Sequence, residues 1–238
     1  MTSTTVPVIF DLDGTLVDPA GGITDGIAAA LTEHGLAVPS QDLLEAMVGP
    51  KLSDSLLNVA AVPPAMLRAV IRTYRMHYLD VGISQSRLYP GIVDLLDAYV
   101  EAGRPVAVAT QKPEGLAQLV LQHHKIAGRF RAIRGSAADE TAAAAGPVGK
   151  TGIIAAAMTD LRTQHAVMVG DRAQDVAGAL ANGLDCVGVS WGFAPDGELE
   201  AAGAVAVVHD TAGLRAKVEE LENVRAAALS EVRNDGAV

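Results

Sequence analysis

Short apolar runs, rich in β-branched residues, recur along the chain and predict buried strands. The first covers residues 6–10, and others follow at 105–109, more weakly at 130–133, and at 166–169, 186–189 and 205–208. Continuous apolar runs are typical of strands that are covered on both faces. Segments with helical periodicity lie between them, at 114–124, 151–161, 173–181 and 214–229. This alternation predicts an α/β fold with a doubly wound parallel sheet.

The stretch from about residue 19 to 87 breaks the alternation. It holds helical patterns near 23–34, 40–48, 53–59 and 64–79, separated by prolines and glycines, and shows no convincing strand. We therefore expect an all-helical domain at 18–87, inserted into a core formed by 1–17 and 88–224. Residues 137–149 are expected to form a loop or frayed helix, and 225–238 a partly disordered tail.

Composition and charge exclude several classes of protein. The 238 residues are 50% hydrophobic with a formal net charge of −10, which argues against disorder and against a net field that attracts nucleic acid or an anionic membrane. The single cysteine, Cys186, excludes an intrachain disulfide and a cysteine-rich zinc site. No apolar run approaches the roughly 20 residues that span a bilayer, and the first ten residues do not resemble a signal peptide. We expect a cytoplasmic monomer or homodimer without a nucleic-acid or membrane partner.

Polar residues follow several of the predicted strands. Asp11 and Asp13 come directly after the first strand, Thr110 ends the second, and Asp171 follows a later one, with Asp175 four residues further on. In open α/β sheets, ligands bind beyond the carboxyl ends of the strands, so these positions are suited to a site. Two carboxylates this close need a cation or a shared proton. The structural alternatives are a solvated turn, a helix cap and acidic residues at a helix start.

Together with Lys150, which precedes a predicted helix, these elements resemble the motifs of the haloacid dehalogenase superfamily. The superfamily order is DxDGT, then Thr or Ser, then Lys, then GDxxxD. It stands here at residues 11–15, Thr110, Lys150 and residues 170–175, and the resemblance covers about residues 6–222. Residues 187–192 are similar to the phosphoglycolate phosphatase-like branch, and the helical insertion is similar to its small α-helical cap. The resemblance implies a Rossmann-like core with that cap.

The resemblance also implies an activity, the hydrolysis of small-molecule phosphate monoesters with Mg²⁺ through an aspartyl-phosphate. The substrate could be phosphoglycolate, a nucleotide or a sugar phosphate. The implied catalytic residues are Asp11 as nucleophile, Asp13 as general acid and base, and Thr110 and Lys150 as phosphate contacts. The metal is assigned to Asp11, Asp13 through its backbone carbonyl, Asp171, and Asp175 as an orienting neighbour.

Further contacts to the substrate are expected from the residues around these motifs, namely Leu12, Gly14, Gln111 and Lys112. Lys51, in the loop at 49–52 of the insertion, is a candidate contact for an anionic part of the substrate. For Arg172, contact with substrate and pairing with an acidic neighbour both stay open. A phosphotransferase or phosphomutase would need the same core residues. A non-catalytic binding protein on this fold is a third hypothesis, which the complete residue set disfavours.

Overall fold

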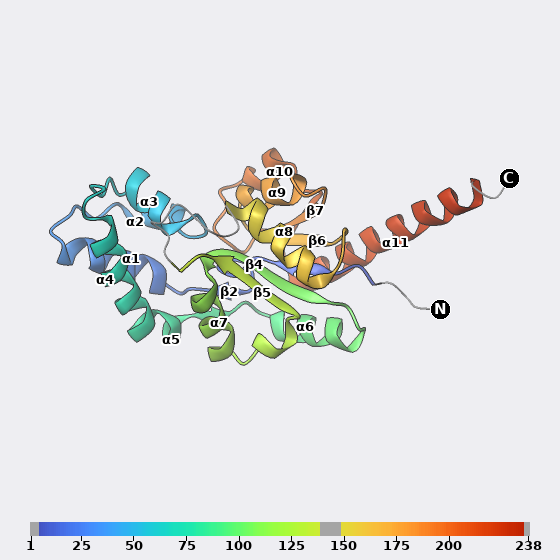
Figure 1. The fold of residues 1–238 in the computed structure, drawn as a ribbon, viewed down its shortest axis with the longest axis horizontal. Coiled ribbons are helices and arrows are strands. Elements are labelled where there is room, and N and C mark those ends of the chain that lie inside the picture. The colour runs from blue at the N-terminus through green and yellow to red at the C-terminus, as the bar shows by residue number, and fades with distance from the viewer. Residues whose placement is uncertain (1–4, 139–148, 236–238) are drawn as a thin grey trace.

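The computed structural model describes residues 5–138 and 149–235 (Figure 1). At its centre is a six-stranded parallel sheet in the order β5-β4-β1-β6-β7-β8. Its strands are β1 (Val8–Phe10), β4 (Val106–Pro113), β5 (Ala132–Ser136), β6 (Val167–Gly170), β7 (Asp185–Val189) and β8 (Ala206–Val208). Each of the six apolar runs in the sequence therefore contributes one strand to a single sheet.

Helices cover both faces of this sheet (Figure 1). One face is covered by α6 (Ile92–Glu101), α7 (Glu114–His123) and α11 (Thr211–Asp235), and the other by α8 (Gly149–Leu161), α9 (Ala173–Leu180) and α10 (Glu198–Ala202). Successive side chains of a strand point to opposite faces. Accordingly, Val8 and Phe10 join the first core and Ile9 joins the second, and all three are fully buried. The prediction of a doubly wound α/β fold is confirmed.

The chain reverses its direction of winding at β1, which lies between β4 and β6. From β1 the chain first builds β4 and β5 on one side, and later β6, β7 and β8 on the other. Such a reversal opens a crevice at the carboxyl ends of the strands, where α/β proteins bind their ligands. The residues that follow β1, β4 and β6 are therefore placed around one crevice.

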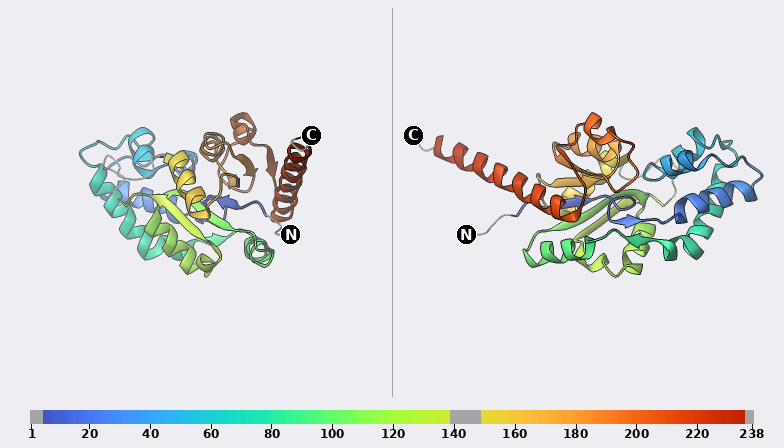
Figure 2. Two further views of the ribbon diagram at one scale, coloured as in Figure 1. Left: turned by 45° about the vertical axis from the view of Figure 1, so that its right-hand side comes forward. Right: turned by 180° about the vertical axis from the view of Figure 1, so that it is seen from behind.

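A group of helices, called here the helical insertion, stands between β1 and α6 in the sequence. It consists of α1 (Gly22–Glu33), α2 (Gln41–Ala46), α3 (Leu52–Asn58), α4 (Leu67–His77), a π-helical turn at Tyr78–Gly82 and α5 (Ile83–Gln85). These helices lie together at one end of the molecule (Figure 2). The two chain crossings that lead into and out of the insertion, β2 (Val17–Asp18) and β3 (Arg87–Leu88), pair antiparallel. This pairing supports the predicted domain boundaries, which we retain as a proposal.

The last helix is longer than the sequence pattern indicated. It continues to Asp235, past the expected end near residue 229 and into the expected tail, and it projects away from the sheet (Figure 1). The tail begins with good helix formers at 225–229, Arg, three Ala and Leu, and Glu231 and Arg233 follow. Most of the loop expected at 137–149 lies outside the described residues. Within the described ranges, no helix combines the length and apolar character that crossing a bilayer requires.

Candidate active site

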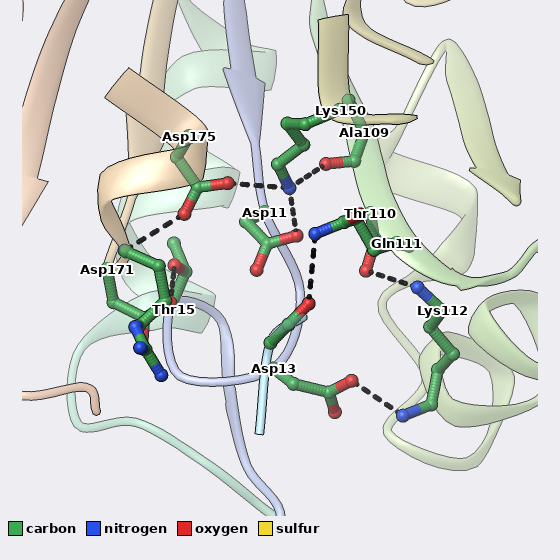
Figure 3. Close-up of polar contacts among 12 residues, drawn as sticks. Asp11, Asp13, Thr15, Ala109, Thr110, Gln111, Lys112, Lys150, Asp171 and Asp175 are labelled. Atoms are coloured by element: carbon green, nitrogen blue, oxygen red, sulfur yellow. Dashed lines mark hydrogen bonds and ion pairs between the residues drawn. The ribbon is translucent and has the colours of Figure 1, made fainter. Parts of the chain in front are cut away.

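The carboxyl ends of β1, β4 and β6 bring the predicted polar residues together (Figure 3). Asp11 is 3% exposed, Asp13 6%, Thr110 2% and Asp171 0%. Ionisable side chains are almost never buried to this extent unless they are paired or bind a cation. The burial therefore argues against the solvated turn that the sequence left open, and favours a binding site in which these side chains are paired or hold a cation.

Lys150, in the first turn of α8, joins two of the carboxylates. Its Nζ lies 2.5 Å from Oδ1 of Asp11 and 2.7 Å from Oδ1 of Asp175, and it donates to the carbonyl oxygen of Ala109 at 2.7 Å. Burial by itself lowers the pKa of Lys150, but Asp11 and Asp175 outweigh it and the net shift is upward. Gly178 of α9 allows this close packing, because a Cβ there would lie 2.9 Å from Cγ of Lys150. Lys150 therefore stays charged at the centre of the site.

Three buried carboxylates form a cluster that fits a divalent cation. Oxygens of Asp11, Asp171 and Asp175 lie within 4.8 Å of one another. Asp171 accepts hydrogen bonds from Oγ1 of Thr15 at 3.1 Å and from the N–H of Phe193 at 2.9 Å. Burial, followed by the charges of Asp175 and Asp11, raises the pKa of Asp171 well above its usual range. One lysine does not balance three carboxylates, and hard oxygen ligands suit Mg²⁺.

The side chain of Asp13 lies outside this cluster and faces the other way. Its Oδ2 accepts a hydrogen bond from Nζ of Lys112 at 2.6 Å, whereas its Oδ1 is buried without a hydrogen-bond partner. Burial raises the pKa of Asp13; Lys112 lowers it, Asp11 raises it, and the net shift is upward. A carboxyl group with a raised pKa and an unoccupied oxygen is suited to give and take a proton. Asp13 would reach a metal only through its backbone carbonyl, as the resemblance implies.

The loop after β1 depends on a glycine. Gly14 has φ +85°, and a Cβ there would lie 2.1 Å from Oδ2 of Asp171. Its N–H donates to the carbonyl oxygen of Val17 at 2.8 Å, so it is already used within the loop. The structure thus shows a role for Gly14 in the turn, and its contact with the substrate stays a prediction. The side chain of Leu12 is fully buried, which leaves its backbone N–H as the expected contact.

The end of β4 connects the site to the helical insertion. Oγ1 of Thr110 accepts a hydrogen bond from the N–H of Lys112 at 3.2 Å. Nε2 of Gln111 donates to the carbonyl oxygen of Gly49 in the insertion at 3.4 Å. Nζ of Lys112 also lies 4.5 Å from the ring centre of Tyr78, which belongs to the π-helical turn. The two residues after Thr110 therefore touch the insertion, and one of them, Lys112, also bonds to the carboxyl group of Asp13.

Arg172 makes a second connection between core and insertion. Its Nε lies 3.0 Å from Oε1 of Glu198, and its Nη1 donates to the carbonyl oxygen of Val48 at 3.0 Å. Of the two interpretations left open by the sequence, the structure shows pairing with an acidic neighbour. The contact with Val48 adds a bridge to the insertion that the sequence pattern did not indicate.

A cleft lies between the helical insertion and the core beside Asp13. The insertion lines it with Ile23, Met47, Gly49, Pro50, Leu52 and Tyr74. The core lines it with Asp13, Gln111, Lys112, Pro113 and Leu116. Its volume is about 40 Å³, which leaves space for a few water molecules, so the insertion stands close against the core. Lys51, which was expected to face the site, is absent from this lining among the described residues, although both of its neighbours belong to it.

Some residues of the site belong to none of the sequence motifs. Glu198 holds Arg172 and also accepts the N–H of Ala173 at 2.8 Å, but it belongs to no motif. Phe193 contributes only a backbone N–H, which any residue but proline could supply. Gly192 is the one sequence feature here that reflects the close packing around Asp171, because a Cβ at this position would lie 2.3 Å from Cβ of Asp171.

Comparison with known proteins places the chain in a family. The model of haloacid dehalogenase-like hydrolases matches residues 8–189. Over 214 residues, 89% of this chain and 95% of the relative, the sequence is 34% identical to a 5′-nucleotidase of Pseudomonas aeruginosa. It is 33% identical over 192 residues to a phosphoglycolate phosphatase of Agrobacterium fabrum, covering 78% of this chain and 80% of that one.

A third relative is the tyrosine-protein kinase PtkA of Mycobacterium tuberculosis. It is 37% identical over 204 residues, which cover 85% of this chain and 68% of PtkA. The solved structure of PtkA matches with a TM-score of 0.75 at 33% identity, covering 90% of this chain and 99% of the solved chain. These matches confirm the resemblance that the sequence motifs carry. The chain belongs to the family of haloacid dehalogenase-like hydrolases.

Proposed function

We propose that this phosphatase hydrolyses small-molecule phosphate monoesters with Mg²⁺, using Asp11 as the nucleophile. The family and the relatives named 5′-nucleotidase and phosphoglycolate phosphatase support the enzyme class, a phosphoric monoester hydrolase. The observation that carries the proposal is the buried cluster of Asp11, Asp171 and Asp175 around Lys150, with Asp13 beside it. Phosphoryl transfer depends mainly on positioning and charge compensation, and this arrangement supplies both.

The residues divide the reaction into two steps. In the first, an oxygen of Asp11 bonds to phosphorus while the bond from phosphorus to the leaving oxygen breaks, and Asp13 gives its proton to that oxygen. In the second, a water oxygen bonds to phosphorus, its proton passes to Asp13, and the bond to Asp11 breaks to release inorganic phosphate. Oδ1 of Asp13 is the atom suited to hold the proton, because Lys112 occupies Oδ2.

The remaining side chains position and neutralise charge. Lys150 fixes the Asp11 carboxylate at 2.5 Å, and Asp175 in turn holds Lys150. The Thr110 hydroxyl accepts from a backbone N–H, so its own O–H can donate to a phosphoryl oxygen. Mg²⁺ held by Asp11, Asp171 and the backbone carbonyl of Asp13 would supply further charge neutralisation at the phosphoryl oxygens.

The proposal is tested by phosphate release from a panel of monoesters in the presence of Mg²⁺. Wild type is compared with Asp11→Asn and with Asp42→Asn, a matched change at an exposed position. We expect Asp11→Asn to lose at least about 10³-fold in rate and Asp42→Asn to retain wild-type rates. Chelation should abolish release, and Mg²⁺ should restore it better than Ca²⁺, which takes more ligands in looser geometry. Wild-type release by Asp11→Asn would overturn the proposal.

Transfer of the phosphoryl group to an acceptor other than water is the second candidate. The 37% identity to a relative named tyrosine-protein kinase favours it. An acceptor hydroxyl would then take the place of water in the second step, with the same residues in use. Ester consumption and phosphate release are measured together, with a tyrosine-containing peptide or a sugar present. Equal amounts indicate hydrolysis, and a phosphate deficit matched by phosphorylated acceptor indicates transfer.

A further inference from the structure

One loop of the helical insertion is held by the core at two consecutive carbonyl groups. Nη1 of Arg172 donates to the carbonyl oxygen of Val48 at 3.0 Å, and Nε2 of Gln111 donates to the carbonyl oxygen of Gly49 at 3.4 Å. Gln111 belongs to β4, and Arg172 lies two residues past the end of β6. These two strands flank β1 on opposite sides, so the core contacts the loop from both sides of the crevice.

The Arg172 side chain is fixed in the orientation that this contact needs. Its Nε donates to Oε1 of Glu198 at 3.0 Å, and the same oxygen accepts the N–H of Ala173 at 2.8 Å. Only 12% of the Arg172 side chain and 20% of the Glu198 side chain are exposed. A guanidinium can serve two acceptors at once, because its N–H donors form a rigid planar fork. Arg172 therefore pairs with Glu198 through Nε and still offers Nη1 to the insertion.

The loop approaches Arg172 this closely because residue 49 is a glycine. Its φ is +99°, and a Cβ there would lie 3.1 Å from Cγ of Arg172 and 3.2 Å from Nε2 of Gln174. Both distances are shorter than ordinary van der Waals contact. A side chain at this position would therefore press the loop away from Arg172, and glycine avoids this.

The same loop closes the cleft beside Asp13. Gly49 and Pro50 line this cleft, and its volume is about 40 Å³ with the loop in this position. That is space for a few water molecules or a leaving group of similar size, and a nucleoside would not fit. A larger leaving group can therefore bind only when the insertion is displaced, which breaks the hydrogen bond between Arg172 and Val48.

We propose that Arg172 is a positioning residue that holds the insertion closed, and that its bond to Val48 favours phosphate monoesters with small leaving groups over bulky ones. The inference rests on the proposed function, because it assumes that phosphate binds at Asp11 and that the leaving group points to the cleft. The bond is present in the transition state of a small ester and absent from that of a bulky one. The ratio of two kcat/KM values depends only on the two transition states, so losing the bond should favour the bulky ester.

Hydroxyethyl phosphate and adenosine 5′-monophosphate test the inference, because both leaving groups are uncharged and they differ greatly in size. In Arg172→Met, kcat/KM for the nucleotide relative to hydroxyethyl phosphate should rise at least about tenfold, as expected for the loss of one hydrogen bond from a charged donor. Gly49→Ala disturbs the same contact from the insertion and should raise the ratio as well. The two changes together should do no more than Arg172→Met alone. An unchanged ratio in Arg172→Met would overturn the inference, and additive effects in the double variant would count against a shared contact.

Matched controls separate this contact from the loss of a charge and from backbone strain. Arg131→Met removes an exposed arginine. Gly35→Ala, also in the insertion, places a Cβ at φ +66° with no atom of the described residues within 4 Å. Both should leave the ratio unchanged. Damage to the catalytic cluster next to Arg172 would lower both rates alike and would not move the ratio.

The position of the insertion is measured directly between spin labels at Asp42→Cys in the insertion and Glu200→Cys in the core, both exposed positions. Cys186 is fully buried and stays unlabelled. Without substrate, Arg172→Met should shift the distance distribution to longer values, whereas Arg131→Met should not. Identical distributions would overturn the inference, whether or not any ester is hydrolysed. A shift to longer distances without phosphate release from either ester, in wild type or variants, would instead contradict the proposed function, so the two failures are distinguishable.

Discussion

A β-carbon at Gly14 would disturb the site in two separable ways. The backbone there has φ +85°, which L-residues rarely adopt, and the added atom would lie 2.1 Å from Oδ2 of Asp171. Two other glycines isolate these effects. Gly103 has φ +68° and nothing within 4 Å of its Cβ position, whereas Gly192 lacks a positive φ but its Cβ would lie 2.3 Å from Cβ of Asp171.

The magnitudes follow from these contacts. The left-handed conformation costs an L-residue about 1–2 kcal/mol, so Gly103→Ala should lower Tm by about 2–8 °C in a chain of this size. Gly14→Ala carries the same strain and also displaces Asp171 from Thr15 and Phe193. Each of those hydrogen bonds contributes about 1–3 kcal/mol, so its unfolding free energy should fall by about 3–8 kcal/mol. Gly192→Ala should lose the hydrogen bonds of Asp171 without the strain of a left-handed backbone.

The assay is thermal unfolding of the three variants together with Mg²⁺-dependent phosphate release. Gly103→Ala should be less stable than wild type but keep its kcat/KM. Gly14→Ala and Gly192→Ala should both lose most of their activity, because both move Asp171. The reasoning is refuted if Gly14→Ala is no less stable than Gly103→Ala and hydrolyses esters at the wild-type rate.

Three further predictions concern single side chains. Lys150→Met leaves two buried carboxylates without their cation. It should lower the unfolding free energy measured in urea by about 3–5 kcal/mol and abolish hydrolysis. The control Lys125→Met, at an exposed position, should change neither the stability nor the activity. Tyr78→Leu removes the ring below Lys112 and should lower kcat by up to about tenfold, while Tyr78→Phe should retain it; equal rates in both would contradict this role. Cys186 is fully buried, and burial raises the pKa of its thiol. A thiol reagent should therefore label it only in denaturant. Rapid labelling of the native protein would contradict this packing.

The strands and the acidic site could be predicted because their signals are local. A buried parallel strand is a continuous apolar run, and Asp11 and Asp171 directly follow such runs. Helix α6 was missed even though its buried residues Ile92, Leu95 and Leu96 have helical spacing.

The partners of the charged side chains could not be predicted, because they depend on how distant segments meet. Lys112 was expected to contact the substrate, and nothing in the sequence indicated that it also bonds to Asp13, 99 positions away. Arg172 likewise reaches the carbonyl oxygen of Val48, 124 positions away. The use of the Gly14 N–H within its own loop is also a property of the folded backbone. Residue types thus located the site, whereas its internal pairing required the structure.

The central claim is that Asp11 carries the phosphoryl group during turnover. Wild-type protein and Asp11→Asn are quenched in acid while they turn over a phosphate monoester with Mg²⁺. The mass of the peptide containing residue 11 is measured by mass spectrometry, and the rate of phosphate release is measured in parallel. The account predicts a mass increase of one phosphoryl group on this peptide in wild type, with neither the increase nor release above background in Asp11→Asn. Phosphate release at the wild-type rate by Asp11→Asn, with no phosphorylated peptide in either protein, would contradict it.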